Sequence, residues 1–428
     1  MKNIHRHLTI IIKLCLLCTI IFSLVMLMTY SFSDKYVEDK VIESANTLKQ
    51  EGPYYRLSKS IQTQVDNYTE SYVLNMAVHR EKQWHINAFL NPYYENEAII
   101  DDPEIERINS VIDGIGKKAN AYYGRYWQGH LSIIRPLLLF LNLKQIYIVF
   151  SIVMYLMIIY IIYLINKHID FIYSLLFMLS LLFIRIWIVP LSSKFYFSFL
   201  VCFVISIIIL NSKRDLDDKF YNLLFFISGA TTVFLDYLST PLVSFGIPCI
   251  LLFMLNKENI DSLTTRKALN AYFRLLIYYL SGYLLLGLSN WLLYIIFSAN
   301  SLQAINTIVI RVNNWTGNAR FNELDINRLS SIKQALSVGI YKGEYYKDIY
   351  IFIELLFVLY FIFIKRNNMT MIMLLINAIP YIWWIIMSTS VFLHAWAVYR
   401  TIVISYLAKF SIIYYHIEKK KCSKLSCG

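Results

Sequence analysis

The stretch Leu8–Phe32, LTIIIKLCLLCTIIFSLVMLMTYSF, decides the fold, because it is apolar throughout except for one charged residue, Lys13. A helix of about 20 apolar residues is long enough to cross a bilayer. Lys13 lies close to the basic segment Met1–His7, so its side chain can extend to the inner surface of the membrane. The stretch exceeds a signal-peptide core in length and has no small-x-small cleavage motif. We therefore expect a retained anchor helix with its N-terminus inside.

The rest of the chain has the composition of a protein that spans the membrane repeatedly. Its 428 residues are 57% hydrophobic and only 16% charged, and the mean hydropathy is +0.51. This balance makes the bilayer the solvent for most of the chain. The expected fold is an all-α polytopic membrane protein with about ten transmembrane helices. After the anchor, the spans are expected at about 145–165, 170–189, 195–210, 220–236, 241–256, 272–297, 349–364, 369–388 and 400–416.

Charge determines the expected orientation. A formal net charge of +12 would suggest nucleic-acid binding in a soluble protein. Here Lys and Arg cluster in short connectors between apolar runs, which indicates a positive-inside bias and no nucleic-acid partner. Both termini are then inside. The parts are an anchor helix at 1–32, a first extracytoplasmic loop at 33–136, transmembrane helices at 137–297, a second extracytoplasmic loop at 298–348, and the last helices with a basic cytoplasmic tail at 349–428.

The cysteines indicate neither disulfides nor a metal site. All six lie in apolar spans or in the C-terminal tail, away from the expected outer segments. Cys15 and Cys18 have no second pair to complete a zinc site, and no two of the expected outer histidines have metal-ligand spacing. We therefore expect no metal ligands, while a requirement for a divalent metal stays open.

The first outer loop contains two helical patterns. Apolar residues recur at helical spacing between residues 56 and 80, which predicts an amphipathic helix on which Asp66 and Glu70 share a face. A second pattern runs from Ile105 to Ala119 after a start signal at 101–103. Helices of this kind lie on a membrane surface. Residues Asn91–Tyr94 between them predict a turn.

Later hairpins bring further polar residues to the same outer side. The stretch between the basic clusters near residues 219 and 257 has length for two spans and must turn near Asp236–Pro241. The stretch from 368 to 416 must turn near His394–Arg400 by the same argument. The second outer loop adds Arg311 and Arg320.

Three carboxylates are candidates for catalysis. Partial burial above the membrane would raise the pKa of Asp66 or Glu70 toward that of a working base, although both could equally lie on a solvated helix face. Asp236 closes a predicted span, where a carboxylate is costly without a partner or a function. An ion pair or a helix cap is its alternative role. Asp34 competes with the first two because it directly follows the anchor.

The candidate anion-binding residues are cationic or imidazole side chains on the outer side. A guanidinium suits phosphate, and a lipid phosphate is the phosphate available at a membrane. Ordinary anchoring at the interface is the alternative for each arginine. Tryptophans close to the histidines suit sugar rings or an interfacial belt. The candidates are Arg125, His130, Arg311, Arg320, His394 and Arg400.

An early anchor, a large acidic outer loop and many later spans together resemble the GT-C superfamily of membrane glycosyltransferases. Within it, short blocks are similar to a group of Gram-positive cell-surface proteins. The blocks are Asp66–Asn75, Tyr126–His130 with Arg135-Pro136, Asp236–Pro241 and His394–Arg400. The likeness covers nearly the whole chain in architecture, but only these blocks in residues.

This resemblance implies an inverting transfer of sugar from a polyprenyl-phosphate donor to a cell-envelope glycan or glycopolymer. The site would lie on the extracytoplasmic face of the bacterial plasma membrane, with a first-loop carboxylate as base and basic residues on the phosphate. Members usually place an acidic residue soon after the first span; Asp34 fits that position, which leaves the identity of the base open.

Two other functions stay possible on the sequence. A polysaccharide polymerase or ligase would use a polyprenyl-diphosphate donor and would carry its larger loop late in the chain. A transporter of lipid-linked oligosaccharide would show internal repeats and ionisable residues at mid-membrane, which the sequence lacks. No G-x-x-x-x-G-K-[ST] motif is present, so an ATP-driven motor is not expected within this chain.

Overall fold

The computed structural model describes residues 2–96, 103–212, 214–237, 239–317, 328–341, 355, 357–360 and 366–425. The chain is almost entirely helical in these ranges. Its one sheet has two strands, β1 (Pro92–Tyr93) and β2 (Ala121–Tyr122), which pair antiparallel. The prediction of an all-α polytopic fold agrees with this architecture.

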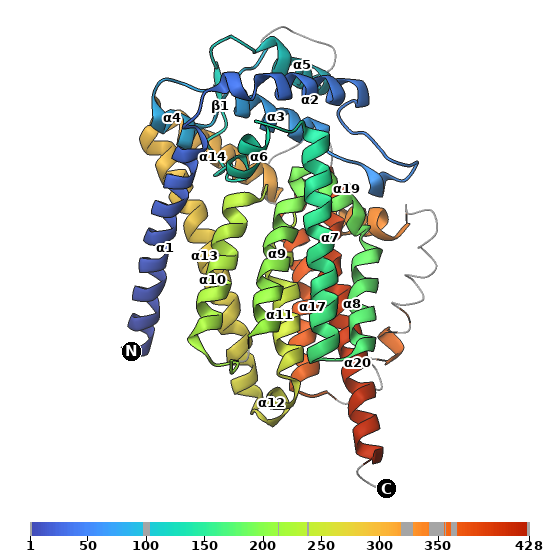
Figure 1. Ribbon diagram of the computed structural model, residues 1–428. Helices are drawn as coiled ribbons and strands as arrows, with labels where there is room; N and C mark the ends of the chain where they lie inside the picture. Colours follow the sequence, from blue (N-terminus) through green and yellow to red (C-terminus); the bar gives the residue numbers. More distant parts are fainter. Residues whose placement is uncertain are drawn as a thin grey trace.

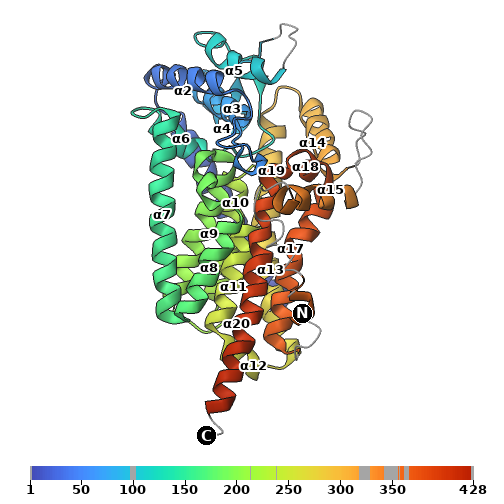
Figure 2. The ribbon, with the colours of Figure 1, turned by 90° about the vertical axis from the view of Figure 1, so that its right-hand side faces the viewer.

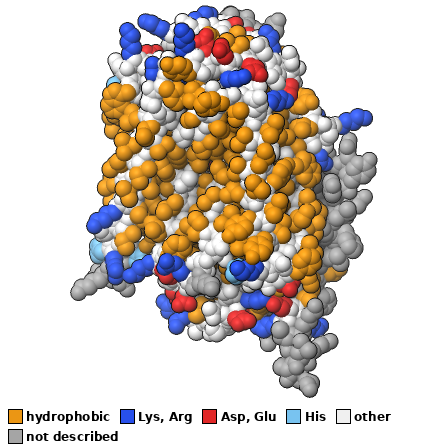
Figure 3. Space-filling view, viewed as in Figure 1, with side chains coloured by type: hydrophobic (Ala, Val, Ile, Leu, Met, Phe, Trp, Pro, Cys, Tyr) orange, Lys and Arg blue, Asp and Glu red, His pale blue; other side chains and the backbone are white. Residues whose placement is uncertain are grey.

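Within the described ranges, six helical segments are long and apolar enough to cross a membrane. Their lengths of 19 to 33 residues agree with the thickness of a bilayer. In the space-filling view, apolar side chains form a broad belt between two zones in which charged side chains gather (Figure 3). The six segments belong to α1 (Lys2–Thr29), α7 (Leu143–His168), α9 (Ser193–Asn211), α13 (Thr265–Phe297), α17 (Asn368–Ile386) and α19 (Ala395–Val398) continued by η5 (Tyr399–Ile402) and α20 (Val403–Leu425).

Three shorter apolar helices lie among these six in the bundle (Figure 1). They are α8 (Phe171–Phe183), α10 (Lys219–Leu235) and α11 (Val243–Leu255). The η3 turn (Ile186–Leu191) follows α8, and α12 (Lys257–Ser262) follows α11. The span expected at 349–364 falls largely outside the described residues. The number of ten spans therefore stays a prediction.

Helices α10 and α13 approach each other closely because glycines remove side chains at their contact. A Cβ added to Gly229 would lie 2.1 Å from the carbonyl oxygen of Tyr279, and one added to Gly282 would lie 2.1 Å from that of Phe226. Real Cβ atoms do not approach backbone so closely, so only glycine allows this crossing.

The segment 33–136, expected as the first outer loop, folds as a small domain over one end of the bundle and is here called the ectodomain after this expectation (Figure 1). Both termini lie toward the opposite end. Its helix α2 buries Val41, Ala45 and Leu48, a helical spacing that the sequence analysis overlooked. Its elements are η1 (Asp34–Tyr36), α2 (Glu38–Glu51), η2 (Ile61–Thr63), α3 (Asn67–Val78), α4 (Trp84–Leu90), α5 (Pro103–Asp113) and α6 (Leu131–Leu137), with the two strands.

The helix predicted over residues 56–80 was wrong in its first part. Helix α3 begins only at Asn67, because the Asp66 side chain accepts a hydrogen bond from the Thr69 backbone N–H and so caps the helix. The second predicted helix is α5, and it ends before Gly114 and Gly116, the latter with φ +75°. The predicted turn contains Asn91 in a left-handed conformation, with φ 49°, directly before β1.

The segment expected as the second outer loop contains a further group of short helices. They are α14 (Ser301–Thr316), α15 (Arg328–Leu336) and the π-helical turn η4 (Ser337–Tyr341). Figure 2 shows α14 and α15 beneath the ectodomain, beside α18 (Ser388–Leu393) and α19. The expected hairpin turn near His394 is therefore built from short helices. These helices close one side of a space below α3.

Candidate functional site

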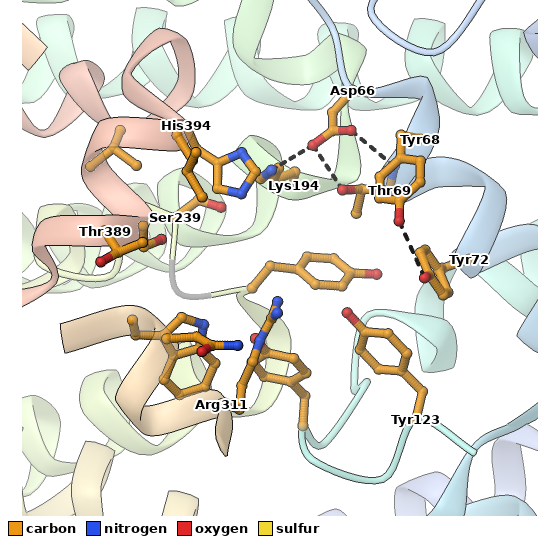
Figure 4. Close-up of a pocket in the computed structure, with 17 residues that line it drawn as sticks. Asp66, Tyr68, Thr69, Tyr72, Tyr123, Lys194, Ser239, Arg311, Thr389 and His394 are labelled. Atoms are coloured by element: carbon orange, nitrogen blue, oxygen red, sulfur yellow. Dashed lines mark hydrogen bonds and ion pairs between the residues drawn. The ribbon is translucent and has the colours of Figure 1, made fainter. Parts of the chain in front are cut away.

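A cavity of about 130 Å³ lies where the ectodomain meets the outer ends of the bundle helices. Its walls come from the start of α3, the start of α9, the α10–α11 connector, α14 and the α18–α19 corner (Figure 4). Tyr123 and Tyr126, from the connector between β2 and α6, also line it, so six segments of the chain meet at one point. The charged, imidazole and hydroxyl side chains on its walls include Asp66, Thr69, Lys194, Ser239, Arg311, Thr389, Ser390 and His394.

Asp66 occupies a rigid position on this wall. As N-cap of α3 it accepts hydrogen bonds from the Thr69 backbone N–H at 2.9 Å and from the Thr69 hydroxyl at 2.7 Å. Its side chain is almost fully buried. An N-cap carboxylate also interacts favourably with the positive end of the helix dipole. The local sequence Asp-Asn-Tyr-Thr thus fixes the carboxylate at the cavity.

Lys194, in the first turn of α9, is the partner of Asp66. The Lys194 Nζ lies 2.5 Å from Asp66 Oδ2, and both side chains are nearly buried. Burial alone would raise the pKa of Asp66, but the Lys194 charge and the Thr69 hydrogen bonds outweigh burial and hold that pKa below its usual value. Asp66 is therefore ionised at neutral pH.

His394 lies on the cavity wall close to this ion pair (Figure 4). The positive charge of Lys194, together with burial, lowers the pKa of His394 to about 3. The imidazole is therefore uncharged at neutral pH. A neutral imidazole can both donate and accept one hydrogen bond, and this suits a hydroxyl group.

Arg311 and two hydroxyls form a second polar group in the same cavity. The Arg311 guanidinium points into the space from α14 (Figure 4). Ser239 and Thr389 are 3% and 1% exposed, and their hydroxyl oxygens have no hydrogen-bond partner among the described residues. Buried polar atoms without a partner are costly. A cation beside two such hydroxyls is suited to an anion.

The remaining wall consists largely of tyrosine rings in contact with one another. Consecutive ring centroids lie 5.0 to 6.5 Å apart. Such rings combine an apolar face with a polar edge, the property that the sequence analysis sought for sugar binding. The rings are those of Tyr68, Tyr72, Tyr123, Tyr126 and Tyr237.

Glu70 lies behind the cavity and not on its wall. Its Oε1 accepts hydrogen bonds from the Ser193 backbone N–H at 2.6 Å and from the Ser192 hydroxyl at 2.9 Å. Its carboxyl group therefore holds the N-terminus of α9 against α3, one residue before Lys194. Burial raises the pKa of Glu70 to about 7 in spite of these hydrogen bonds.

Asp236 and His130 also lie outside the polar cavity. Asp236 Oδ1 accepts a hydrogen bond from the Ser198 hydroxyl at 2.5 Å, which joins the end of α10 to α9. His130 Nε2 hydrogen-bonds the Tyr237 hydroxyl and so supports a ring of the cavity wall. Burial lowers the pKa of His130 to about 3, and its imidazole is uncharged at neutral pH.

The other predicted anion-binding arginines have different positions. The Arg125 guanidinium lies 3.8 Å from the centroid of the Tyr123 ring and behind the cavity. Arg400 is fully buried and donates to the carbonyl oxygens of Gln62 and Trp396, both at 2.8 Å. Arg320 lies outside the described residues. Of the predicted site residues, the fold thus brings Asp66, Arg311 and His394 together in one cavity.

Asp34, the competing candidate, is engaged elsewhere. Its Oδ1 lies 2.7 Å from Nη2 of the buried Arg135. Arg135 also donates to the carbonyl oxygens of Thr29 and Ala77, at 2.6 and 2.9 Å. These contacts join the end of α1, the end of α3 and α6. Asp34 and Arg135 therefore hold the ectodomain on the anchor helix.

Lys194 is not among the site residues predicted from the sequence, although a signal for it exists. Lys194 is the lone charged residue in the stretch Ile186–Asn211, at the outer end of an expected span. A cation there opposes the positive-inside bias, so a specific partner could have been sought. Its distant partner could not be identified from one chain.

The candidate site has no group of metal ligands in the part of the chain that the structure describes, since no three His, Cys, Asp or Glu side chains there could hold a metal ion. No protein-family model matches the chain, and no curated protein and no solved structure matches it either.

Proposed function

We propose that this protein is a membrane glycosyltransferase that moves a sugar from a polyprenyl-phosphate donor to a hydroxyl of a cell-envelope glycan. The observation that carries the proposal is the convergence of an ionised carboxylate, two cations and two unpartnered hydroxyls in one cavity beside the bundle. A carboxylate suits removal of a proton from a hydroxyl, and cations with hydroxyl donors suit a phosphate.

In the proposed reaction, an acceptor oxygen forms a bond to the anomeric carbon of the donor sugar. The bond from that carbon to the phosphate oxygen breaks, and its electron pair leaves with the lipid phosphate. Asp66 takes the proton of the acceptor hydroxyl. Attack from the face opposite the phosphate inverts the anomeric centre.

Arg311 and Lys194 stabilise the negative charge that grows on the departing phosphate. Preorganised cations in a site shielded from water are effective in this role, because they need no reorganisation during the reaction. Ser239 and Thr389 donate their free hydroxyl hydrogens to the phosphate. Lys194 remains in contact with Asp66 and keeps the carboxylate ionised until the acceptor binds.

The aromatic wall supports a sugar as the group that is transferred. Five tyrosine rings give apolar faces for the C–H surface of a pyranose and phenol groups for its hydroxyls. Glu70, Asp236, His130 and Arg400 have supporting roles in this proposal, because they hold the elements that carry the cavity. Arg125 supports the wall through its stacking on Tyr123.

The finer topology is part of the same proposal. About ten spans with both termini inside would place the ectodomain and the cavity on the extracytoplasmic face of a bacterial plasma membrane, where a lipid-linked donor can reach it. This arrangement is the one expected of a GT-C-like enzyme. Protease or thiol-labelling access to tags in 33–136 and 298–348 in intact cells tests it.

The decisive test is turnover of polyprenyl-phosphate sugar by purified protein in liposomes. Asp66→Asn is expected to lower turnover at least about 100-fold, the scale on which a general base contributes. Asp39→Asn is the matched control, because Asp39 is an exposed aspartate of the ectodomain that lies in α2. Equal turnover of the Asp66 variant and the wild type would remove Asp66 from the mechanism.

The lipid product separates the proposal from its rivals. Release of polyprenyl monophosphate supports the proposed donor, and release of the diphosphate identifies a polymerase or ligase. Movement of a lipid-linked oligosaccharide across the liposome membrane without bond formation identifies a transporter and contradicts the enzymatic proposal.

A further inference from the structure

A second cavity, here called the apolar groove, lies beside the polar one and has a volume of about 380 Å³. Helices α10, α13 and α17 form most of it, and the segment Arg125–Trp127 closes its outer end. Apolar atoms make up nearly all of its exposed lining, and Arg125 and Asp236 are the charged residues among those that line it. The groove is lined on α13 by Tyr283, Leu284, Gly287, Leu288, Asn290 and Trp291.

The apolar groove adjoins the polar cavity. Tyr126 and Trp315 line both spaces, and their ring centroids lie 5.7 Å apart. These two rings therefore mark the boundary between an apolar and a charged compartment. A molecule that occupies both must have a polar head joined directly to an apolar chain.

The groove borders the lipid-facing surface. Leu284 and Leu288 on α13 and Ile386 on α17 line it, and they are 56%, 49% and 52% exposed. Both helices are long enough to cross the membrane. Large apolar side chains with this exposure in the apolar belt face acyl chains. A lipid can therefore reach the groove sideways, between α13 and α17.

We infer that the apolar groove binds the head-proximal part of the donor's polyprenyl chain while the phosphate and sugar occupy the polar cavity. This inference rests on the proposed function. The groove has a limited volume, about 380 Å³. The protein therefore contacts only the first isoprene units, and the remainder of the chain stays in the membrane.

One glycine makes the space for this chain. A Cβ added to Gly287 would contact only Val233, at an ordinary 3.6 Å, so the position is open toward the groove. Gly282, one and a half turns earlier on α13, is closed by the backbone of α10. A large side chain at position 287 therefore fills the groove and leaves the helix crossing intact.

The experiment compares Gly287→Phe with the wild type on donors of graded chain length in liposomes. The Gly287→Phe variant is expected to raise KM for long-chain donors at least 10-fold while kcat stays near the wild-type value. For a donor with a chain of only a few carbons, the two proteins should have similar KM. Wild-type KM should fall as the first isoprene units are added to the chain and then level off.

Ile277→Phe is the control, because Ile277 lies on the same helix and is 56% exposed to the membrane, away from the groove. It tests whether an added aromatic ring on α13 changes KM for the long-chain donor without filling the groove. Equal KM for the long donor in the wild type and the Gly287→Phe variant would overturn the inference. So would a KM that keeps falling over the full length of the chain.

A binding measurement separates this inference from the proposed function. A photoreactive long-chain polyprenyl phosphate without sugar should label the wild type, should label the Asp39→Asn variant equally, and should label the Gly287→Phe variant at least 10-fold less. If labelling follows this pattern but no sugar is transferred, the inference that the groove binds the polyprenyl chain holds and the enzyme proposal fails. If an ordinary phospholipid competes as well as polyprenyl phosphate, the groove is a general lipid site and the inference fails.

Discussion

Lys194 Nζ lies 2.5 Å from Asp66 Oδ2, although 128 positions separate the two residues in the chain. The pair joins the first turn of a bundle helix to the cap of an ectodomain helix. It holds the pKa of the Asp66 carboxylate below its usual value in a place where burial alone would raise that pKa. The chemistry proposed for the cavity depends on this contact.

Removing one partner of this pair should destabilise the protein strongly. Lys194→Met leaves a buried carboxylate uncompensated, and breaking such pairs costs about 3–5 kcal/mol. The double variant with Asp66→Asn should recover most of the loss, because neither charge remains. Thermal unfolding in detergent checks this. A double variant that folds well yet transfers no sugar would separate the role of the pair in stability from its role in the reaction. If the stability losses of the two single variants simply add in the double variant, the two residues are not coupled.

Glu70 should give the stability of the protein a pH dependence. Its pKa in the fold is about 7, above its ordinary value of 4.5, so the folded state binds the proton more tightly than the unfolded state. The stabilising effect is complete below pH 4.5 and is lost as the pH rises toward 7, by about 3 kcal/mol. Unfolding midpoints between pH 4.5 and 8 measure it.

Glu70→Gln should flatten this pH dependence, because the amide does not ionise. Glu38→Gln, at the start of α2, should leave the slope as in the wild type. A wild-type midpoint that rises over this pH range would contradict the assignment of the raised pKa to Glu70.

Arg135 should be needed for ectodomain docking in a way that lysine cannot replace. It donates to three backbone carbonyls, of Thr29, Phe32 and Ala77, as well as to Asp34. Lysine has a single nitrogen and cannot reach them all. Arg135→Lys should cost about 2–4 kcal/mol on unfolding, whereas Arg56→Lys, at an exposed arginine of the same loop, should cost little. Similar unfolding for both variants would show that Arg135 is an ordinary interfacial anchor.

The α10–α13 crossing should tolerate no side chain at Gly282. Its Cβ would lie 2.1 Å from the Phe226 carbonyl oxygen, so Gly282→Ala should force the helices apart and cost at least about 2 kcal/mol. At Gly287 the same substitution meets only Val233 at 3.6 Å, and the stability should be nearly unchanged. Thermal unfolding of both variants compares them on one helix. Equal midpoints would mean that the crossing has room to adjust.

The sequence by itself determined the solvent of each segment. Long apolar runs must lie in lipid, where every backbone polar group has to be bonded within a helix, and this fixed an all-α polytopic fold. It also located the ectodomain and the Asp236 turn, because span length and charge are properties of single segments. Asp66, Arg311 and His394 were found as candidates from their expected place on the outer side.

Only the tertiary structure decided which of these residues meet. Asp66 and Glu70 lie one helical turn apart, yet one faces the cavity and the other caps α9. Arg311 lines the cavity, whereas Arg400 bonds backbone carbonyls. Lys194 indicated the need for a partner but not which one, and Ser239 and Thr389 gave no signal, because their positions follow from how α9, the α10–α11 connector and α18 pack. The physical reason is that hydropathy and charge are properties of single segments of the chain. Packing and hydrogen bonding form between distant segments, and one sequence does not show which segments are neighbours in space.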